Sequence, residues 1–298
     1  MTSTAVETKT PADGGHTDRG LSDQGRYGQY HDPVLEADAM RKVVAEGCAM
    51  VPGKAAVMLQ IAAKGVGKGV SDHSSFTKRP VERARRSLVY IYVMTFGSLA
   101  ERRRVTDATH RAHMRVKGPD YDANDVHLQL WVAATIYWSL VAGYEDMYGP
   151  LDDDFADRVY KEFSVMATGL RVPPDMWPKD RDAFRVYWDR TVNELEVTDE
   201  ARAVAQDVMY PGQNLPWGWW ILSKVMGPSQ RFTTIELLPE RIRNELGFPS
   251  TFYTRNMYWL KSSVDRVMYP WLPESVRHLT KNHYMADFRD RIAKGVRI

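Results

Sequence analysis

Apolar side chains recur every three or four residues along most of the chain, which is the spacing of a helix with one buried face. The first such stretch runs from Pro33 to Val44 and breaks at Gly47, and residues 54–63 are apolar on almost every side. We therefore predict two helices here, the second of them buried. No run alternates between apolar and polar residues over a useful length, so the predicted fold class is all-α.

Two consecutive helices follow, and they carry most of the candidate chemistry. Pro80 suits the first position of a helix and Gly97 suits the residue just past its end. Ser98 and Glu101 then form an S-x-x-E capping box for the next helix. Its predicted apolar stripe consists of Val105, Ala108, Thr109, Ala112 and Val116.

The glycine-rich residues 64–70 do not have the spacing of a phosphate-binding loop, so we expect a flexible or closely packed turn there. Residues 126–148 predict a central helix buried on all sides, because their uninterrupted apolar stretch is shorter than the roughly 18 to 20 residues of a membrane span. Residues 210–220 predict an aromatic loop that covers a core edge rather than a ligand pocket. Further helices are predicted at residues 153–170, 181–194, 199–208, 239–246, 250–269 and 274–294.

Composition narrows the function classes. A formal net charge of +2 over 298 residues is too small to indicate a nucleic-acid partner. The single cysteine, Cys48, excludes an internal disulfide, a Cys-rich zinc site and an iron–sulfur cluster held by this chain alone. Residues 1–28 have almost no large apolar side chains and predict a disordered tail before one helical domain at residues 29–298. The N-terminus has no apolar core of a signal peptide, so we expect a cytoplasmic protein.

Cationic and hydroxyl side chains share one face of the helix predicted at residues 80–97. Arg83, Ser87, Tyr90 and Met94 recur at helical spacing, and Arg86 borders them. The arginines either reach surface carboxylates or lie in a buried pocket, where they need an anionic or polar partner. The pattern leaves both interpretations open. The arginines at 102–104 are interpreted as a solvated helix face.

Two histidines lie on the following helix. At about 100° per residue, His113 borders the predicted apolar stripe and His110 faces water. With Asp107 upstream, the pair suggests a non-haem metal site, which would need carboxylates from other helices to complete it. A border histidine that is only hydrogen-bonded is the other interpretation.

The order and spacing of seven motifs resemble the MpaB and latex-clearing (rubber oxygenase) catalytic-domain family over most of the chain after the tail. The motifs are VMLQIA (57–62), SDHSSF (71–76), RARRS (83–87), HMRVKG (113–118), YDANDVHLQLWVAATI (121–136), YGPL (148–151) and ELLPERIRNELGF (236–248). The resemblance implies a globin-like helical bundle that binds haem b. It implies an axial histidine in H-x-x-V-x-G, which is His113 here, and a distal Arg-x-x-Lys-Thr element, which falls on Arg83, Arg86 and Ser87.

Two of these distal positions depart from the family pattern, with Arg86 in place of lysine and Ser87 in place of threonine. Arginine does not readily ligate iron, so a resting haem capped by this side chain is not expected. The resemblance implies that Arg83 and Arg86 stabilise negative charge on reduced oxygen and that Ser87 donates to the distal oxygen. The family's acidic base upstream of Arg83 has no clear counterpart, and Asp72 is only a loose substitute.

The sequence thus predicts a haem b oxygenase that uses O₂ or H₂O₂ on a hydrophobic small molecule, such as the alkene of an isoprenoid or a natural-product intermediate. Two alternatives stay open, a haem carrier or sensor without turnover and a non-haem iron protein that uses His110, His113 and Asp107. Neither a nucleic-acid partner nor a transmembrane span is expected, and the sequence leaves a homodimer open.

Overall fold

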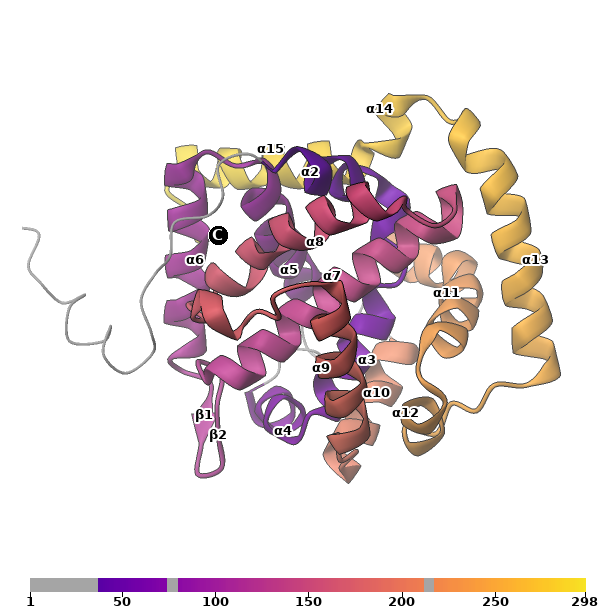
Figure 1. Cartoon of the computed structure of the whole chain (residues 1–298), viewed down its shortest axis with the longest axis horizontal. Helices are drawn as coiled ribbons and strands as arrows, with labels where there is room; N and C mark the ends of the chain where they lie inside the picture. The colour runs from indigo at the N-terminus through magenta and orange to yellow at the C-terminus, as the bar shows by residue number, and fades with distance from the viewer. Residues whose placement is uncertain (1–36, 74–79, 212–216) are drawn as a thin grey trace, which may run out of the picture.

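The longest helix, α7 (Val126–Tyr148), runs through the middle of the computed structural model, and the other helices pack around it (Figure 1). The structure describes residues 37–73, 80–211 and 217–298. Helices α3 (Gly53–Ala62) and α8 (Asp153–Thr168) pack on α7, together with the short 3₁₀ helix η1 (Gly47–Met50). Among the described helices, α7 alone is long and apolar enough to cross a membrane. However, 56% of its most apolar 18-residue stretch is buried, as in a core helix.

The other elements form two groups around this centre. On one side, α5 (Pro80–Phe96) packs against α2 (Asp38–Ala45), α6 (Leu99–His113), α8 and α15 (Leu279–Ala293). On the other side, α4 (Lys64–His73) and α10 (Asp199–Met209) pack with α3, and α11 (Trp217–Leu237) packs with α3 and α13 (Phe252–Met268). The remaining elements are η2 (Pro174–Met176), α9 (Arg181–Glu194), α12 (Glu240–Glu245), η3 (Tyr269–Trp271) and α14 (Glu274–Arg277).

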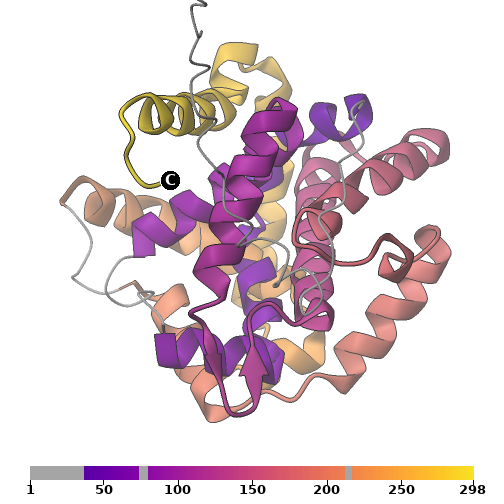
Figure 2. The ribbon, with the colours of Figure 1, turned by 90° about the vertical axis from the view of Figure 1, so that its left-hand side faces the viewer.

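The predicted all-α class is confirmed in the described residues, where the strands are β1 (Lys117–Gly118) and β2 (Tyr121–Asp122). They form an antiparallel hairpin in which Lys117 faces Asp122 and Gly118 faces Tyr121. Figure 2 shows this hairpin directly below α6. The predicted tail at residues 1–28 lies outside the described residues.

Helix boundaries that depend on capping chemistry are confirmed. Helix α5 begins at Pro80 and ends one residue before Gly97. The capping box is complete, because the Ser98 N–H donates to Glu101 Oε2 at 2.7 Å and the Glu101 N–H donates to Ser98 Oγ at 3.3 Å. It fixes the angle between α5 and α6, which carry the predicted site residues.

The turn predicted at residues 64–70 is wrong, because this glycine-rich stretch is helix α4. Glycine usually weakens a helix, but here it allows close packing. A Cβ atom at Gly65 would lie 2.7 Å from a Leu128 methyl group, and one at Gly67 would lie 2.4 Å from the Ile61 carbonyl oxygen. The glycines therefore let α4 approach α7 and the end of α3.

The aromatic loop predicted at residues 210–220 is also wrong in its described part. Helix α11 starts at Trp217, and residues 212–216 lie outside the described residues. The side chains of Tyr210, Trp217 and Trp220 are exposed, so they do not cover a core edge. The helix predicted at residues 274–294 is broken at His278, whose backbone leaves the helical region between α14 and α15.

We expect Gly143→Ala to destabilise the protein by about 3 kcal/mol, because overpacking a rigid core forces the backbone to move. A Cβ atom at this position in α7 would lie 2.7 Å from both the Cys48 carbonyl oxygen and Pro52 Cδ. The matched control is Gly53→Ala in α3, where no atom lies within 4 Å of the added Cβ. Urea unfolding measures both, and equal midpoints for the two variants would contradict the prediction.

Candidate functional site

The polar face predicted on α5 is divided into a packed half and an open half. Tyr90 and Met94 are buried, and the Tyr90 hydroxyl donates to the Met166 carbonyl oxygen at 2.9 Å. Ser87, one turn earlier, is exposed. The C-terminal half of this face therefore anchors α5 to α8, and only the first two turns are available for a ligand.

The arginines on these first turns have different environments. Arg86 is 46% exposed in its side chain, and its Nε donates to Glu82 Oε1 at 3.2 Å. Arg83 is only partly exposed, and burial together with the charge of Arg86 lowers its pKa from 12.5 to about 10. Arg86 thus reaches a surface carboxylate, whereas Arg83 is held in a less polar environment beside a second cation.

Arg85, between them, has a structural contact. It is 8% exposed and forms ion pairs of 2.9 Å with Glu82 and with Asp287 of α15. The ion pair between Arg85 and Asp287 attaches α15 to α5.

His113 is the last residue of α6, and the positive charge of Arg83 acts on its imidazole. Burial, followed by the positive charges of Arg83 and His110, lowers the pKa of His113 from 6.5 to about 4. Its Nδ1 is buried and has no hydrogen-bond partner among the described residues. At neutral pH the imidazole is therefore uncharged, and one ring nitrogen has no protein partner in the part of the chain that is described.

The predicted orientation of His110 is wrong, since this side chain is 7% exposed. Its Nε2 lies 3.1 Å from Nη1 of Arg171, which also lies 3.8 Å from Asp107 through Nη2. Arg171 follows α8 and has a φ of 67°, a left-handed conformation that is rare for a residue with a side chain. The turn after α8 therefore directs a guanidinium group at α6, one helical turn before His113.

The buried face of α6 differs from the predicted apolar stripe, since it consists of Arg102, Val105, Thr106 and His110. Arg102 is 2% exposed and donates to the Thr95 carbonyl oxygen at 3.3 Å, so it is not part of a solvated face, unlike Arg103 and Arg104. The last carbonyl groups of α5 need donors, and Arg102 supplies one. Arg102 and His110 thus lie on the same buried side of α6.

The non-haem metal site is not assembled. In residues 37–73, 80–211 and 217–298, no group of three or more His, Cys, Asp or Glu side chains is arranged to hold a metal ion. The guanidinium of Arg171 instead lies beside both His110 and Asp107. A positive charge at this position opposes cation binding.

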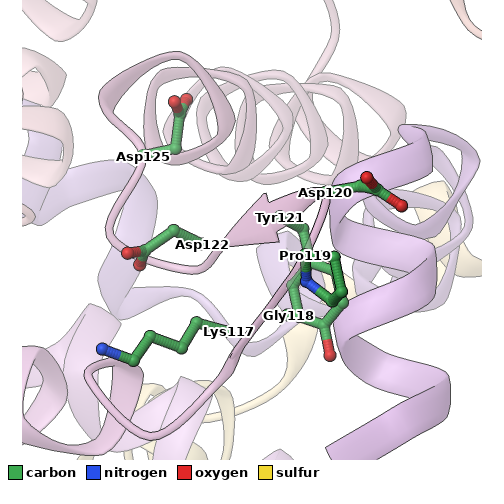
Figure 3. Close-up of a pocket in the computed structure, with 7 residues that line it drawn as sticks. All are labelled: Lys117, Gly118, Pro119, Asp120, Tyr121, Asp122 and Asp125. Carbon is green, nitrogen blue, oxygen red and sulfur yellow. The ribbon is translucent and has the colours of Figure 1, made fainter.

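The hairpin that follows His113 borders a cavity of about 400 Å³ (Figure 3). Figure 3 shows Lys117 and Asp122 pointing to the same side of the hairpin, while Asp120 points to the other. The negative charge of the Asp122 carboxylate acts to raise the pKa of His113, against the larger opposing effects. The lining is Lys117, Gly118, Pro119, Asp120, Tyr121, Asp122 and Asp125, a polar set that does not suit an apolar ligand.

Asp72, the loose candidate for an acidic base, lies beside this hairpin. It accepts a hydrogen bond of 2.9 Å from the Tyr121 hydroxyl. A Cβ atom at Gly118 would lie 2.6 Å from the Tyr121 ring, so the glycine of H-x-x-V-x-G is required for this hairpin to close. The hydrogen bond between Tyr121 and Asp72 attaches α4 to the hairpin that follows His113.

The sequence missed Arg171 and Asp122 as parts of this site. Arg171 lies 61 residues from His110, and neither a motif nor a helical period connects them. Asp122 stands within the motif at residues 121–136, but the motif assigns it no role. Residues 74–76 of the SDHSSF motif lie outside the described residues.

Comparison with known proteins gives one family and two relatives. The family model described as "ER-bound oxygenase mpaB/B'/Rubber oxygenase, catalytic domain" matches residues 40–266. The chain is 35% identical over 256 residues to uncharacterized proteins Mb2261 of Mycobacterium bovis and Rv2237 of Mycobacterium tuberculosis. Each match covers 81% of this chain and 97% of the relative. No solved structure matches the chain significantly.

Proposed function

The chain belongs to the family of MpaB-type and rubber oxygenase catalytic domains, and we propose that it is a haem b-dependent oxygenase acting on a hydrophobic small molecule. The observation that carries this proposal is the imidazole of His113, which is uncharged at neutral pH and whose buried Nδ1 has no hydrogen-bond partner among the described residues. The charge of the partly buried Arg83 acts on this ring. By the family motifs, His113 would hold the haem iron and Arg83 would face the oxidant. The substrate class is the alkene of an isoprenoid or of a natural-product intermediate, and the co-substrate is O₂ or H₂O₂.

The residues present fit haem b. A histidine binds haem iron through a ring nitrogen of the neutral imidazole, and the surroundings of His113 keep it neutral well below pH 7. A buried ring nitrogen without a partner is rare in a folded protein, and ligand binding is one reason to retain such a group. Haem b, when bound, supplies an iron centre that reacts with O₂ or peroxide.

The chain's own residues supply binding and electrostatics. His113 would hold the iron. Arg83 would donate to oxygen as negative charge develops there, and its partial burial makes this interaction stronger than it would be in water. Arg86, fixed by Glu82, adds positive potential at the same place, because its charge is one cause of the lowered pKa of Arg83. Ser87, on the open half of the face, would offer a hydroxyl donor to the oxidant.

The proposal is tested by expressing the full chain with a haem precursor and recording its absorption spectrum and turnover. We expect a strong haem band and peroxide-dependent oxidation of guaiacol. Absence of the band from pure, folded protein would overturn haem binding. A band without turnover of guaiacol or of any alkene under O₂ would assign the protein to haem carriage or sensing instead.

We expect Arg83→Leu to lower the turnover number by about 100-fold while haem content stays unchanged, because removing one donor to developing negative charge costs about this factor. The control is Arg104→Leu, since Arg104 is exposed on α6. Guaiacol oxidation at saturating peroxide, normalised to bound haem, measures both variants. Equal turnover in the two variants would remove Arg83 from the proposed mechanism.

A further inference from the structure

Helix α13 presents a row of large apolar side chains to solvent. Phe252 is 83% exposed, Trp259 69% and Trp271, in η3, 86%. We call this surface the outer face of α13, and it consists of Phe252, Trp259, Leu260, Val264, Val267, Met268 and Trp271. So many large apolar side chains exposed within residues 252–271 indicate an interaction site.

The opposite face of α13 fixes its orientation. Asp146 at the end of α7 accepts hydrogen bonds of 3.0 Å from Ser262 Oγ and from Arg266 Nη2, and its backbone oxygen accepts a further bond of 2.6 Å from Arg266 Nε. Ser262 is 4% exposed. Because these contacts hold the polar side of α13 against α7, the helix cannot rotate to bury Trp259 and Val267.

Helix α11 extends the apolar surface, because it packs along α13. The rings of Phe232 and Tyr253 meet edge to face at 5.5 Å between centroids. Further towards its N-terminus, α11 exposes Trp217, Ile221, Val225 and Met226. Two neighbouring helices thus both carry exposed aliphatic and tryptophan side chains.

The charges near this surface favour a negatively charged partner. Within α13 the only acid is Asp265, and Lys261 pairs with it at 2.7 Å. Glu236 of α11 accepts hydrogen bonds from Ser250 and Thr254. By contrast, Lys224 and Arg255 form no ion pair with any described residue, and Lys224 lies 5.6 Å from the Trp220 ring centroid.

We propose that the outer face of α13 binds the surface of an anionic phospholipid bilayer. Tryptophan side chains favour the membrane interface, the aliphatic side chains reach the acyl boundary, and Lys224 and Arg255 attract anionic headgroups. A second copy of the chain is the weaker occupant, because a twofold contact would bring these unmatched cations of both copies to the same surface. In Figure 1, α13 lies on the opposite side of the molecule from α6, so this attachment leaves the residues around His113 facing away from the bilayer.

The test is flotation of the full chain with vesicles of phosphatidylcholine alone or mixed with an equal part of phosphatidylglycerol. The wild type floats with the mixed vesicles, and added salt weakens its binding. Trp259→Ser combined with Trp271→Ser lowers the affinity by at least about tenfold, because two large apolar side chains are lost from the contact. Val186→Ser, which removes a 71% exposed apolar side chain of α9, leaves binding unchanged.

A second pair of variants tests the charges. Lys224→Glu combined with Arg255→Glu removes the preference for phosphatidylglycerol, at roughly fivefold or more for each cation. Each variant should unfold thermally at the same midpoint as the wild type. An unchanged midpoint shows that the loss of vesicle affinity comes from the altered surface and not from unfolding. Wild-type protein that floats with neither vesicle overturns the proposal. A wild-type dimer that the double tryptophan variant dissociates, without vesicle binding, assigns the face to a second copy and also overturns it.

Discussion

His113→Ala is expected to purify without the haem absorption band of the wild type, while His127→Ala keeps the full band. His113 is the proposed iron ligand, and its buried Nδ1 has no hydrogen-bond partner among the described residues. His127 is an exposed histidine in the first turn of α7 and controls for the loss of one imidazole. Haem content per mole of protein, measured as the pyridine complex, should fall by at least about tenfold in His113→Ala, in line with the loss of a metal ligand.

Two further measurements sharpen this result. Free imidazole should restore part of the band in His113→Ala, because the cavity left by the side chain admits the ligand that was removed. Full haem content in His113→Ala would contradict the assignment of the axial ligand. Restored haem binding with imidazole shows in addition that the variant is folded.

The acidity of His113 adds a dependence on pH. Because folding lowers its pKa from 6.5 to about 4, the unfolded chain binds this proton more tightly than the folded chain. The stability that this group contributes is present above pH 6.5 and is lost as the pH falls towards 4. The haem-free wild type should therefore lose stability over this range more steeply than His113→Ala.

Most of the fold could be predicted because helix ends and apolar periods are local signals. The cap at Ser98 and Glu101 depends on residues three positions apart, and the start of α5 was indicated by the single residue Pro80. Helix α4 escaped prediction because the cost of its glycines is compensated by contacts with Leu128 and Ile61, which a local pattern does not contain. The globin-like arrangement and the domain limits at residues 1–28 and 29–298 stay predictions.

The candidate site was predictable only where the family motif names its residues. The motif places Arg83 and His113 in one site, and the structure shows that the charge of Arg83 acts on His113. The motif carries no information about His110, which is buried and lies beside Arg171 from the turn after α8. Apolar periodicity failed on α6 because a buried arginine and a buried histidine occupy its inner face.

A buried carboxylate, Glu46, connects the C-terminal part of the chain to the core. It is 7% exposed and accepts hydrogen bonds from the hydroxyls of Tyr148 at 3.1 Å and Tyr269 at 3.0 Å. It also forms an ion pair with Arg277, and His278 Nε2 lies 3.4 Å from it. These partners stand 102, 223, 231 and 232 residues away, so no sequence pattern indicated the cluster.

We expect Glu46→Ala to destabilise the protein by about 3 kcal/mol, because removal of one partner leaves a mostly buried guanidinium without its counter-charge. The Arg277 side chain is only 21% exposed, and the two tyrosine hydroxyls lose their acceptor as well. Glu274→Ala is the matched control, since this carboxylate is 73% exposed and contacts only the edge of the cluster at His278. It should change the free energy of unfolding by less than about 1 kcal/mol.

A double variant distinguishes the loss of a charge partner from the loss of packing. If the unpaired guanidinium causes the destabilisation, Arg277→Met in the Glu46→Ala background should restore part of the stability, so the two effects should not add. Urea unfolding of the wild type, both single variants and the double variant gives this coupling. Strict additivity would show that Glu46 acts by filling space, and the attachment of η3 and α14 would then depend on Tyr148 and Tyr269 instead.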